Sequence, residues 1–243
     1  MPHLVRQAIN EDFMRQAFWS RRLHKWLGLL VGIQALFWMA SGVYMAAISI
    51  DIIHGDHMAH VERPAVTAKA VAVQPSQLAA RFPGMTGFRL KHLLGREVYE
   101  VKYAGGTGLA DAASGRQLDP LGEVQVRELA LQAYQGDGSL SGISLLKQLP
   151  REAAARKAPL WRADFDDSNG STLYISPFTG EVVARRHSLW RAYDFLWMLH
   201  IMDYDKRTDV NNTLLRSASI AGTLFALSGL WLLWFTVRRR AAQ

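Results

Sequence analysis

Residues 26–50 have the sequence WLGLLVGIQALFWMASGVYMAAISI, a run of 25 residues without a charged side chain. A second uncharged run of 21 residues, SASIAGTLFALSGLWLLWFTV, occupies residues 217–237. Twenty-one residues of α-helix are roughly 32 Å long, which is about the thickness of the hydrocarbon core of a bilayer. The alternative is a helix buried inside a soluble protein. We predict two transmembrane helices, over residues 26–50 and 213–237.

The net positive charge lies at the two ends of the chain. The net charge is +7, from 28 Lys and Arg against 21 Asp and Glu. Residues 1–50 carry +3 and residues 213–243 carry +4, so the residues between them are neutral overall. Because basic clusters beside membrane spans stay in the cytoplasm, we expect a cytoplasmic arm (1–25), a cytoplasmic tail (238–243) and an extracytoplasmic middle segment. This layout is typical of a bacterial inner-membrane protein, with the lipid bilayer as its first partner.

Several function classes are excluded or disfavoured by composition. The chain has no Cys, which excludes disulfides, thiolate nucleophiles and iron–sulfur clusters. A nucleic-acid partner is not expected, because the middle segment has no net basic charge. The sequence also contains no GxSxG, HExxH, P-loop or GxGxxG motif. Whether the chain is an enzyme stays open, and an electron-transfer subunit is the most that these residues allow.

The middle segment, residues 51–187, alternates helical and strand-like patterns in two similar cycles. Each cycle has one amphipathic helix followed by short strands separated by Gly-rich turns. The expected helices are 75–82 and 122–135, and the expected strands are 87–94, 97–103, 108–111, 141–148, 160–165, 171–175 and 181–184. This pattern predicts an α+β fold in which helices pack on antiparallel sheet, with a weak internal duplication.

Residues 188–204 form an apolar segment too short to span a bilayer. The segment is about 24 Å long as a helix. Tyr193, Trp197 and His200 are spaced so that they share one helical face. We expect an interfacial or re-entrant helix before the second span, with its aromatic residues as anchors.

Small residues within the two uncharged runs predict close helix packing. Gly28 and Gly32 form a GxxxG motif, and the pairs Ser41-Gly42 and Ser228-Gly229 lie among large side chains. Such residues let helix backbones approach, either within one chain or in a homodimer through Gly28 and Gly32. Another membrane subunit is the alternative partner. The competing explanation is that Gly is simply common in membrane helices.

Several short motifs, in this order along the chain, resemble the PepSY-associated transmembrane helix family. The motifs are Arg22-Leu-His-Lys-Trp-Leu-Gly-Leu29, Ser41-Gly42, Val98-Tyr-Glu-Val101, Asp111-Ala-Ala-Ser-Gly115, Trp197-Met-Leu-His200 and Ser228-Gly-Leu-Trp231. The resemblance implies an inner-membrane accessory or binding protein with a periplasmic PepSY-like domain. Some larger relatives are implicated in iron uptake through ferric siderophores and carry haem, and the PepSY domain is linked elsewhere with peptidase regulation. The chain has fewer clear spans than those relatives.

Three histidines follow the first span directly. His54, His57 and His60 lie within seven residues, together with Asp51 and Asp56. Imidazole and carboxylate suit borderline metals, and a spacing of three places His54 and His57 about one helical turn apart. The sequence predicts a metal or haem site here. The alternative is a solvated juxtamembrane turn, because Gly55 can end the helix.

Two further histidines lie within or beside the uncharged runs. His24 could be an axial ligand of haem b, although the second span has no His to pair with it, so a dimer or another subunit would be needed. His200 could meet His54 or His57 across one haem or metal. Headgroup contact is the alternative for His24, and structural packing is the alternative for His200. His187 is expected at the surface or at a helix cap.

Overall fold

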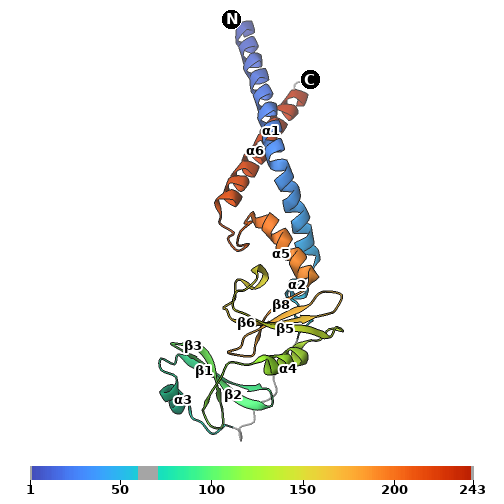
Figure 1. Ribbon diagram of the computed structural model, residues 1–243. Coiled ribbons are helices and arrows are strands. Elements are labelled where there is room, and N and C mark those ends of the chain that lie inside the picture. The colour runs from blue at the N-terminus through green and yellow to red at the C-terminus, as the bar shows by residue number, and fades with distance from the viewer. Residues whose placement is uncertain (1, 60–70, 242–243) are drawn as a thin grey trace. The chain divides into compact units, whose positions relative to one another are not determined.

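A computed structural model describes residues 2–59 and 71–241 (Figure 1). The chain divides into two compact units. The helical unit comprises Met1–Ile48 and Tyr193–Gln243, and the sheet unit comprises Ser49–Ala192.

The helical unit is built around two long helices. Helix α1 extends over Pro2–Ala47 and helix α6 over Thr213–Ala241. Segments Met14–Ala47 and Thr213–Arg238 are long and apolar enough to cross a membrane. Only 11% and 6% of their most apolar windows are buried inside the protein, so neither is the core helix of a soluble domain. Their large apolar side chains face outward, which is stable only where lipid replaces water.

The helices differ from the predicted spans mainly at their ends. Helix α1 starts well before Trp26 and ends at Ala47, where a short break at residues 48–49 precedes helix α2 (Ile50–His54). The expected segment 188–204 forms helix α5, Ser188–Ile201. The two long helices run antiparallel and pack on each other, as the contacts of His24 with Ser228 and of Gly222 with Trp38 show.

The sheet unit contains two four-stranded antiparallel sheets. The first sheet has the order β1-β2-β3-β4 and the second has the order β5-β6-β7-β8. The strands are β1 Gly87–Leu93, β2 Arg96–Tyr103, β3 Gly106–Asp111, β4 Gln117–Leu118, β5 Leu140–Leu146, β6 Leu160–Phe165, β7 Thr172–Ile175 and β8 Val182–Arg186. Helix α3 (Pro75–Arg81) precedes the first sheet, helix α4 (Glu123–Ala133) precedes the second, and a short 3₁₀ turn occupies Arg151–Ala153.

The order of elements confirms the predicted repetition. Each half of the sheet unit is one helix followed by a four-stranded meander. The two-residue strand β4 and the 3₁₀ turn are additions that the hydrophobic pattern did not predict, because both are too short to show a period. The α+β layout with two candidate membrane helices flanking the domain is therefore confirmed.

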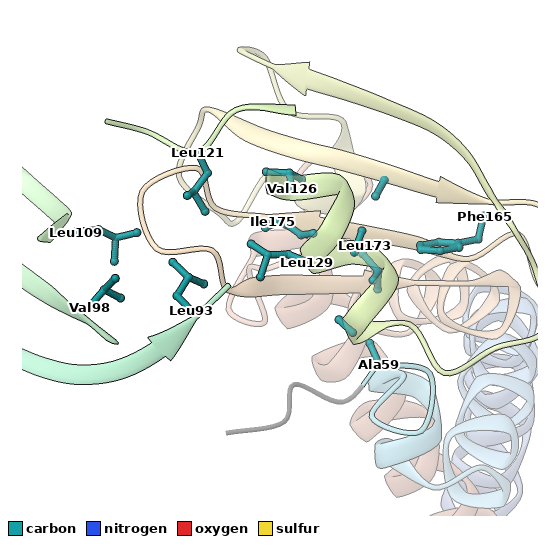
Figure 2. Packing of buried hydrophobic residues seen from close by; sticks show 13 residues of the cluster. Ala59, Leu93, Val98, Leu109, Leu121, Val126, Leu129, Phe165, Leu173 and Ile175 are labelled. Carbon is teal, nitrogen blue, oxygen red and sulfur yellow. The ribbon is translucent and has the colours of Figure 1, made fainter. Parts of the chain in front are cut away.

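The main hydrophobic core joins α4 to both sheets (Figure 2). Val126 and Leu129 of α4 contact this core together with Leu173 and Ile175 of β7. Residues of the first sheet, among them Val98, belong to the same cluster. The two repeats therefore share their main core, and each also has a smaller apolar cluster of its own.

Strand β2 is buried on both faces, which its alternating sequence did not predict. Tyr99 and Val101 pack against α3 in a second cluster, while Glu100 on the opposite face is only 4% exposed. Arg89 and Lys91 of β1 bond the Glu100 carboxylate at 2.8 and 2.6 Å. Burial alone raises the pKa of Glu100, but the hydrogen bonds and charges of these two cations outweigh it and lower the pKa below its usual value.

Candidate functional site

The closest contact between α1 and α6 is built around His24. The imidazole Nδ1 of His24 lies 2.9 Å from the Ser228 hydroxyl oxygen. The ring also stacks on Phe225, with ring centroids 4.4 Å apart and planes 14° from parallel. His24 therefore joins the two helices by one polar bond and one ring contact.

Two glycines make this approach possible. A Cβ atom on Gly229 would lie 3.0 Å from His24 Cε1, and one on Gly28 would lie 3.0 Å from Phe225 Cε2. Larger residues at either position would force the ring contacts apart. Gly28 of the GxxxG motif thus packs within the chain, whereas a Cβ atom on Gly32 would meet no described atom within 4 Å. The homodimer through Gly28 and Gly32 stays a prediction.

A second histidine–serine pair joins α5 to α1. His200 Nδ1 lies 2.8 Å from the Ser41 hydroxyl oxygen. Tyr193, Trp197 and His200 stack in succession, with centroids 6.4 Å apart at each step. The predicted shared face of these three aromatic side chains is therefore confirmed. Both Ser-Gly pairs noted in the sequence contribute their serine to a histidine, a pairing that sequence alone did not reveal.

The end of α5 is held by side chains of the neighbouring helices. The last carbonyls of a helix lack partners within it. Gln34 donates to Leu199 O at 3.1 Å, Trp38 donates to His200 O at 2.7 Å, and Asn212 donates to Ile201 O at 2.9 Å. Unbonded carbonyls are costly in an apolar environment. Because Trp38 is the middle residue of the first uncharged run, α5 ends beside the apolar part of α1.

Each serine hydroxyl bonds both an imidazole and a carbonyl of its own helix. Ser228 Oγ lies 2.7 Å from Phe225 O, and Ser41 Oγ lies 2.6 Å from Phe37 O. Because a hydroxyl has a single proton, the roles at Nδ1 depend on the tautomer of the ring. Where the proton goes to the carbonyl, Nδ1 of the imidazole donates and a neutral ring keeps its lone pair on Nε2. That arrangement is the one found in histidines that bind metal through Nε2.

The three-histidine segment is arranged differently from its prediction. Helix α2 ends at His54, because Gly55 adopts a left-handed conformation with φ +73°. His54 and His57 therefore do not share a helical turn, and the predicted helical spacing is wrong. His57 instead contacts His187 edge-on, with ring centroids 6.0 Å apart. His60 lies outside the described residues.

No group of three or more metal-binding side chains forms within residues 2–59 and 71–241. Metal binding by His54, His57 and His60 stays a prediction. His54 and His57 belong to the sheet unit and His200 to the helical unit. Their predicted meeting across one haem therefore also stays a prediction.

His187 is buried, so its predicted surface position is wrong. The residue is 2% exposed, and its Nε2–H donates to Ile53 O at 3.1 Å. Its own carbonyl accepts from Arg191 N–H, so the predicted position at a helix cap is confirmed for the start of α5. Burial lowers the pKa of His187, and the charge of His57 lowers it further. The bond to Ile53 joins residues far apart in sequence, which no local pattern shows.

We expect the sheet unit to lose stability as the pH falls from about 6.5, the usual pKa of His. Below that pH His187 binds a proton in the unfolded chain, whereas in the folded protein its lowered pKa keeps it neutral. Proton binding therefore favours unfolding. Urea unfolding followed by pulse proteolysis at pH 7.5 and 5.0 measures this loss. The H187Q variant should lose less stability over this range than the wild type. An equal loss in H187Q and wild type would contradict the assignment.

We expect G229A to weaken packing of α1 on α6 by about 1–3 kcal/mol, because the added methyl group overlaps the His24 ring. The double variant H24A/G229A lacks the ring that the methyl group overlaps, so adding G229A to H24A should cost much less stability than adding it to the wild type. The effects of H24A and G229A on stability are then non-additive. G222A is the matched control, since its nearest atom would be 3.9 Å away. Thermal unfolding in detergent measures these variants together with H24A and the wild type. Additive losses would show that the methyl group does not meet His24.

The chain matches a known protein family over most of its length. The family model described as PepSY-associated TM region matches residues 21–243. Searches of curated proteins and of solved structures found no match. The matched range includes the first candidate membrane segment from residue 21 onward, the second candidate membrane segment, α5 and the whole sheet unit. The chain is therefore a membrane protein and belongs to the PepSY-associated TM region family.

Proposed function

We propose that this chain is an inner-membrane accessory or binding protein that presents its PepSY-like sheet unit outside the cytoplasm. The observation that carries this proposal is the combination of two exposed apolar helices with positive charge at the two ends of the chain. Both apolar helices expose most of their surface, and the excess positive charge lies before the first and after the second. The positive-inside rule then favours cytoplasmic termini and a periplasmic sheet unit.

A binding role is supported by the edges of the two sheets. Strands β1 and β4 are the outer strands of the first sheet, and β5 and β8 are those of the second. Strands β1 and β5 are seven residues long, enough to pair with an extended segment of a partner. Outer strands offer backbone hydrogen-bonding groups on one side. A link to iron uptake, which the resemblance implies, stays a prediction.

Cysteine labelling tests the orientation, and the absence of native Cys makes each introduced thiol unique. V124C places a thiol on α4, where Val124 is 81% exposed, and Q16C places one on the exposed side of α1. We expect a membrane-impermeant maleimide to label V124C in spheroplasts, and Q16C only after permeabilisation. Labelling of Q16C alone in intact spheroplasts would overturn the proposed orientation.

A second candidate function is electron transfer through haem b, serving ferric-siderophore reduction. The observation that favours it is that a serine hydroxyl bonds Nδ1 of both His24 and His200 and also a carbonyl of its own helix, which fits the Nδ1–H tautomer with Nε2 as the ligand atom. A bound haem would supply one-electron transfer. Each histidine could supply one of the two axial ligands that a six-coordinate haem b needs. Ser41, which holds His200, lies 17 residues from His24, so the two pairs are separated by roughly 25 Å along α1.

That separation means that His24 and His200 do not bind the same haem. Each would need a second axial ligand, and for His24 the described part of the helical unit offers no other histidine near Ser228. A second copy of the chain or another membrane subunit is the source that this candidate requires.

An absorption spectrum of protein purified after haem-replete expression tests the second candidate. We expect a Soret band that shifts on reduction and that is weakened in H24A and in H200A, because each variant removes one ligand. H92A is the control, since His92 is bonded to Glu97 in the sheet unit. The absence of a Soret band, with no metal found by elemental analysis, would leave only the accessory role.

A further inference from the structure

An apolar cavity of about 380 Å³ opens between α1 and α6 beside the His24–Ser228 pair. Its lining is Leu23, Leu27, Leu224, Leu227, Ser228 and Trp231. The hydroxyl of Ser228 is already engaged, since it bonds both His24 Nδ1 and Phe225 O. The other lining side chains are leucines and one tryptophan, so the cavity favours a hydrocarbon chain over a polar ligand.

The cavity lies where the apolar run of α1 gives way to charge. Leu23 and Leu27 are on either side of Lys25, the last charged residue before the 25-residue uncharged run. In a bilayer this is the level at which acyl chains meet headgroups. A lipid seated here would have its chain between the helices and its headgroup towards the basic end.

Each helix carries one arginine–tryptophan pair beyond the cavity. The Arg22 guanidinium lies 5.9 Å from the ring centroid of Trp19, and that of Arg238 lies 4.6 Å from the ring centroid of Trp234. Trp19 precedes His24 by five residues and Trp234 follows Ser228 by six. Because the helices are antiparallel, both pairs lie on the same side of the His24–Ser228 contact, roughly 8 Å and 9 Å along their helices.

The net charge around these pairs is positive, and the acidic residues of this end, Glu11 and Asp12, precede Arg22 by ten residues or more. No Asp or Glu occurs in residues 13–50 or 213–243. None of the described cations at this end, Arg15, Arg21, Arg22, Lys25 and Arg238, forms an ion pair with a described carboxylate. Guanidinium groups bind phosphate through paired hydrogen bonds, and contact with an aromatic face restricts their motion before binding.

We propose that the α1–α6 cavity binds one anionic phospholipid, with an acyl chain against Leu23, Leu27 and Leu227 and the phosphate between Arg22 and Arg238. A lipid with a net negative headgroup is favoured over a zwitterionic one, because residues 13–50 and 213–243 contain no carboxylate to attract a choline or ethanolamine group. The lipid also covers Ser228, the member of the His24–Ser228 pair that lines the cavity.

Native mass spectrometry of the detergent-purified full chain tests the proposal by titration with phosphatidylglycerol and with phosphatidylcholine. We expect phosphatidylglycerol to bind more tightly by on the order of tenfold, because its headgroup has a net negative charge near two arginines, whereas the choline of phosphatidylcholine neutralises its phosphate. The R22Q/R238Q variant should lose this preference. R156Q/K157Q, which removes two exposed cations of the sheet unit, is the matched control and should keep it.

A second pair of variants tests the acyl-chain site. L227W fills the cavity and should weaken binding of both lipids, whereas L233W adds the same bulk at an exposed position outside the lining and should not. Inorganic phosphate at millimolar concentration should not displace the lipid, because it lacks the chain. Circular dichroism confirms that each variant keeps its helices.

Equal affinity of the wild type for the two lipids would overturn the proposal. Equal effects of L227W and L233W, or displacement by phosphate alone, would overturn it as well. The measurement is made in detergent and does not depend on which side of the membrane the sheet unit occupies. Its outcome is therefore separate from that of the labelling experiment.

Discussion

Polar atoms within apolar helices must find partners inside the protein, and this requirement determines how the helical unit is assembled. A hydroxyl, imidazole or helix-end carbonyl that faces lipid cannot exchange its lost bond for one with water. His24 is bonded to Ser228, His200 to Ser41, and the last carbonyls of α5 to Gln34 and Trp38. These bonds fix which faces of α1 meet α6 and α5, where apolar packing alone has little preference.

The same requirement explains why two small residues are needed at the His24 contact. An imidazole can reach a serine on a neighbouring helix only if the backbones approach closely, and Gly229 and Gly28 allow this approach. Each serine also bonds a carbonyl of its own helix, which fits an imidazole that donates from Nδ1. A structural bond thus leaves one ring nitrogen of each histidine for other chemistry, so packing and a ligand role are compatible explanations for these residues.

The sequence predicted those features that depend on local pattern. The uncharged runs, the helices and strands of the sheet unit and their repetition follow from hydrophobic periods and from turn residues such as Gly55. Burial of Glu100 and of His187 was not predictable in this way. Glu100 is buried because cations on the adjacent strand neutralise it, and His187 is buried because a carbonyl 134 residues away accepts its proton. Both depend on partners that are distant in sequence or across a strand pair.

In the candidate site, too, local sequence pattern identified the unusual residues but not their partners. His24, His200 and the Ser-Gly pairs were recognisable as unusual within apolar runs, but each was interpreted alone, because a histidine was expected to pair with another histidine. The partner of each is a serine on a different helix, and only the antiparallel packing of α1 and α6 and the capping of α5 by α1 bring them together. A polar residue next to glycine in a membrane helix therefore indicates a position where a bulky polar side chain of a neighbouring helix can bind. In this chain the Ser228-Gly229 pair is the clearer case, since the serine supplies the bond and the glycine supplies the space for one and the same ring.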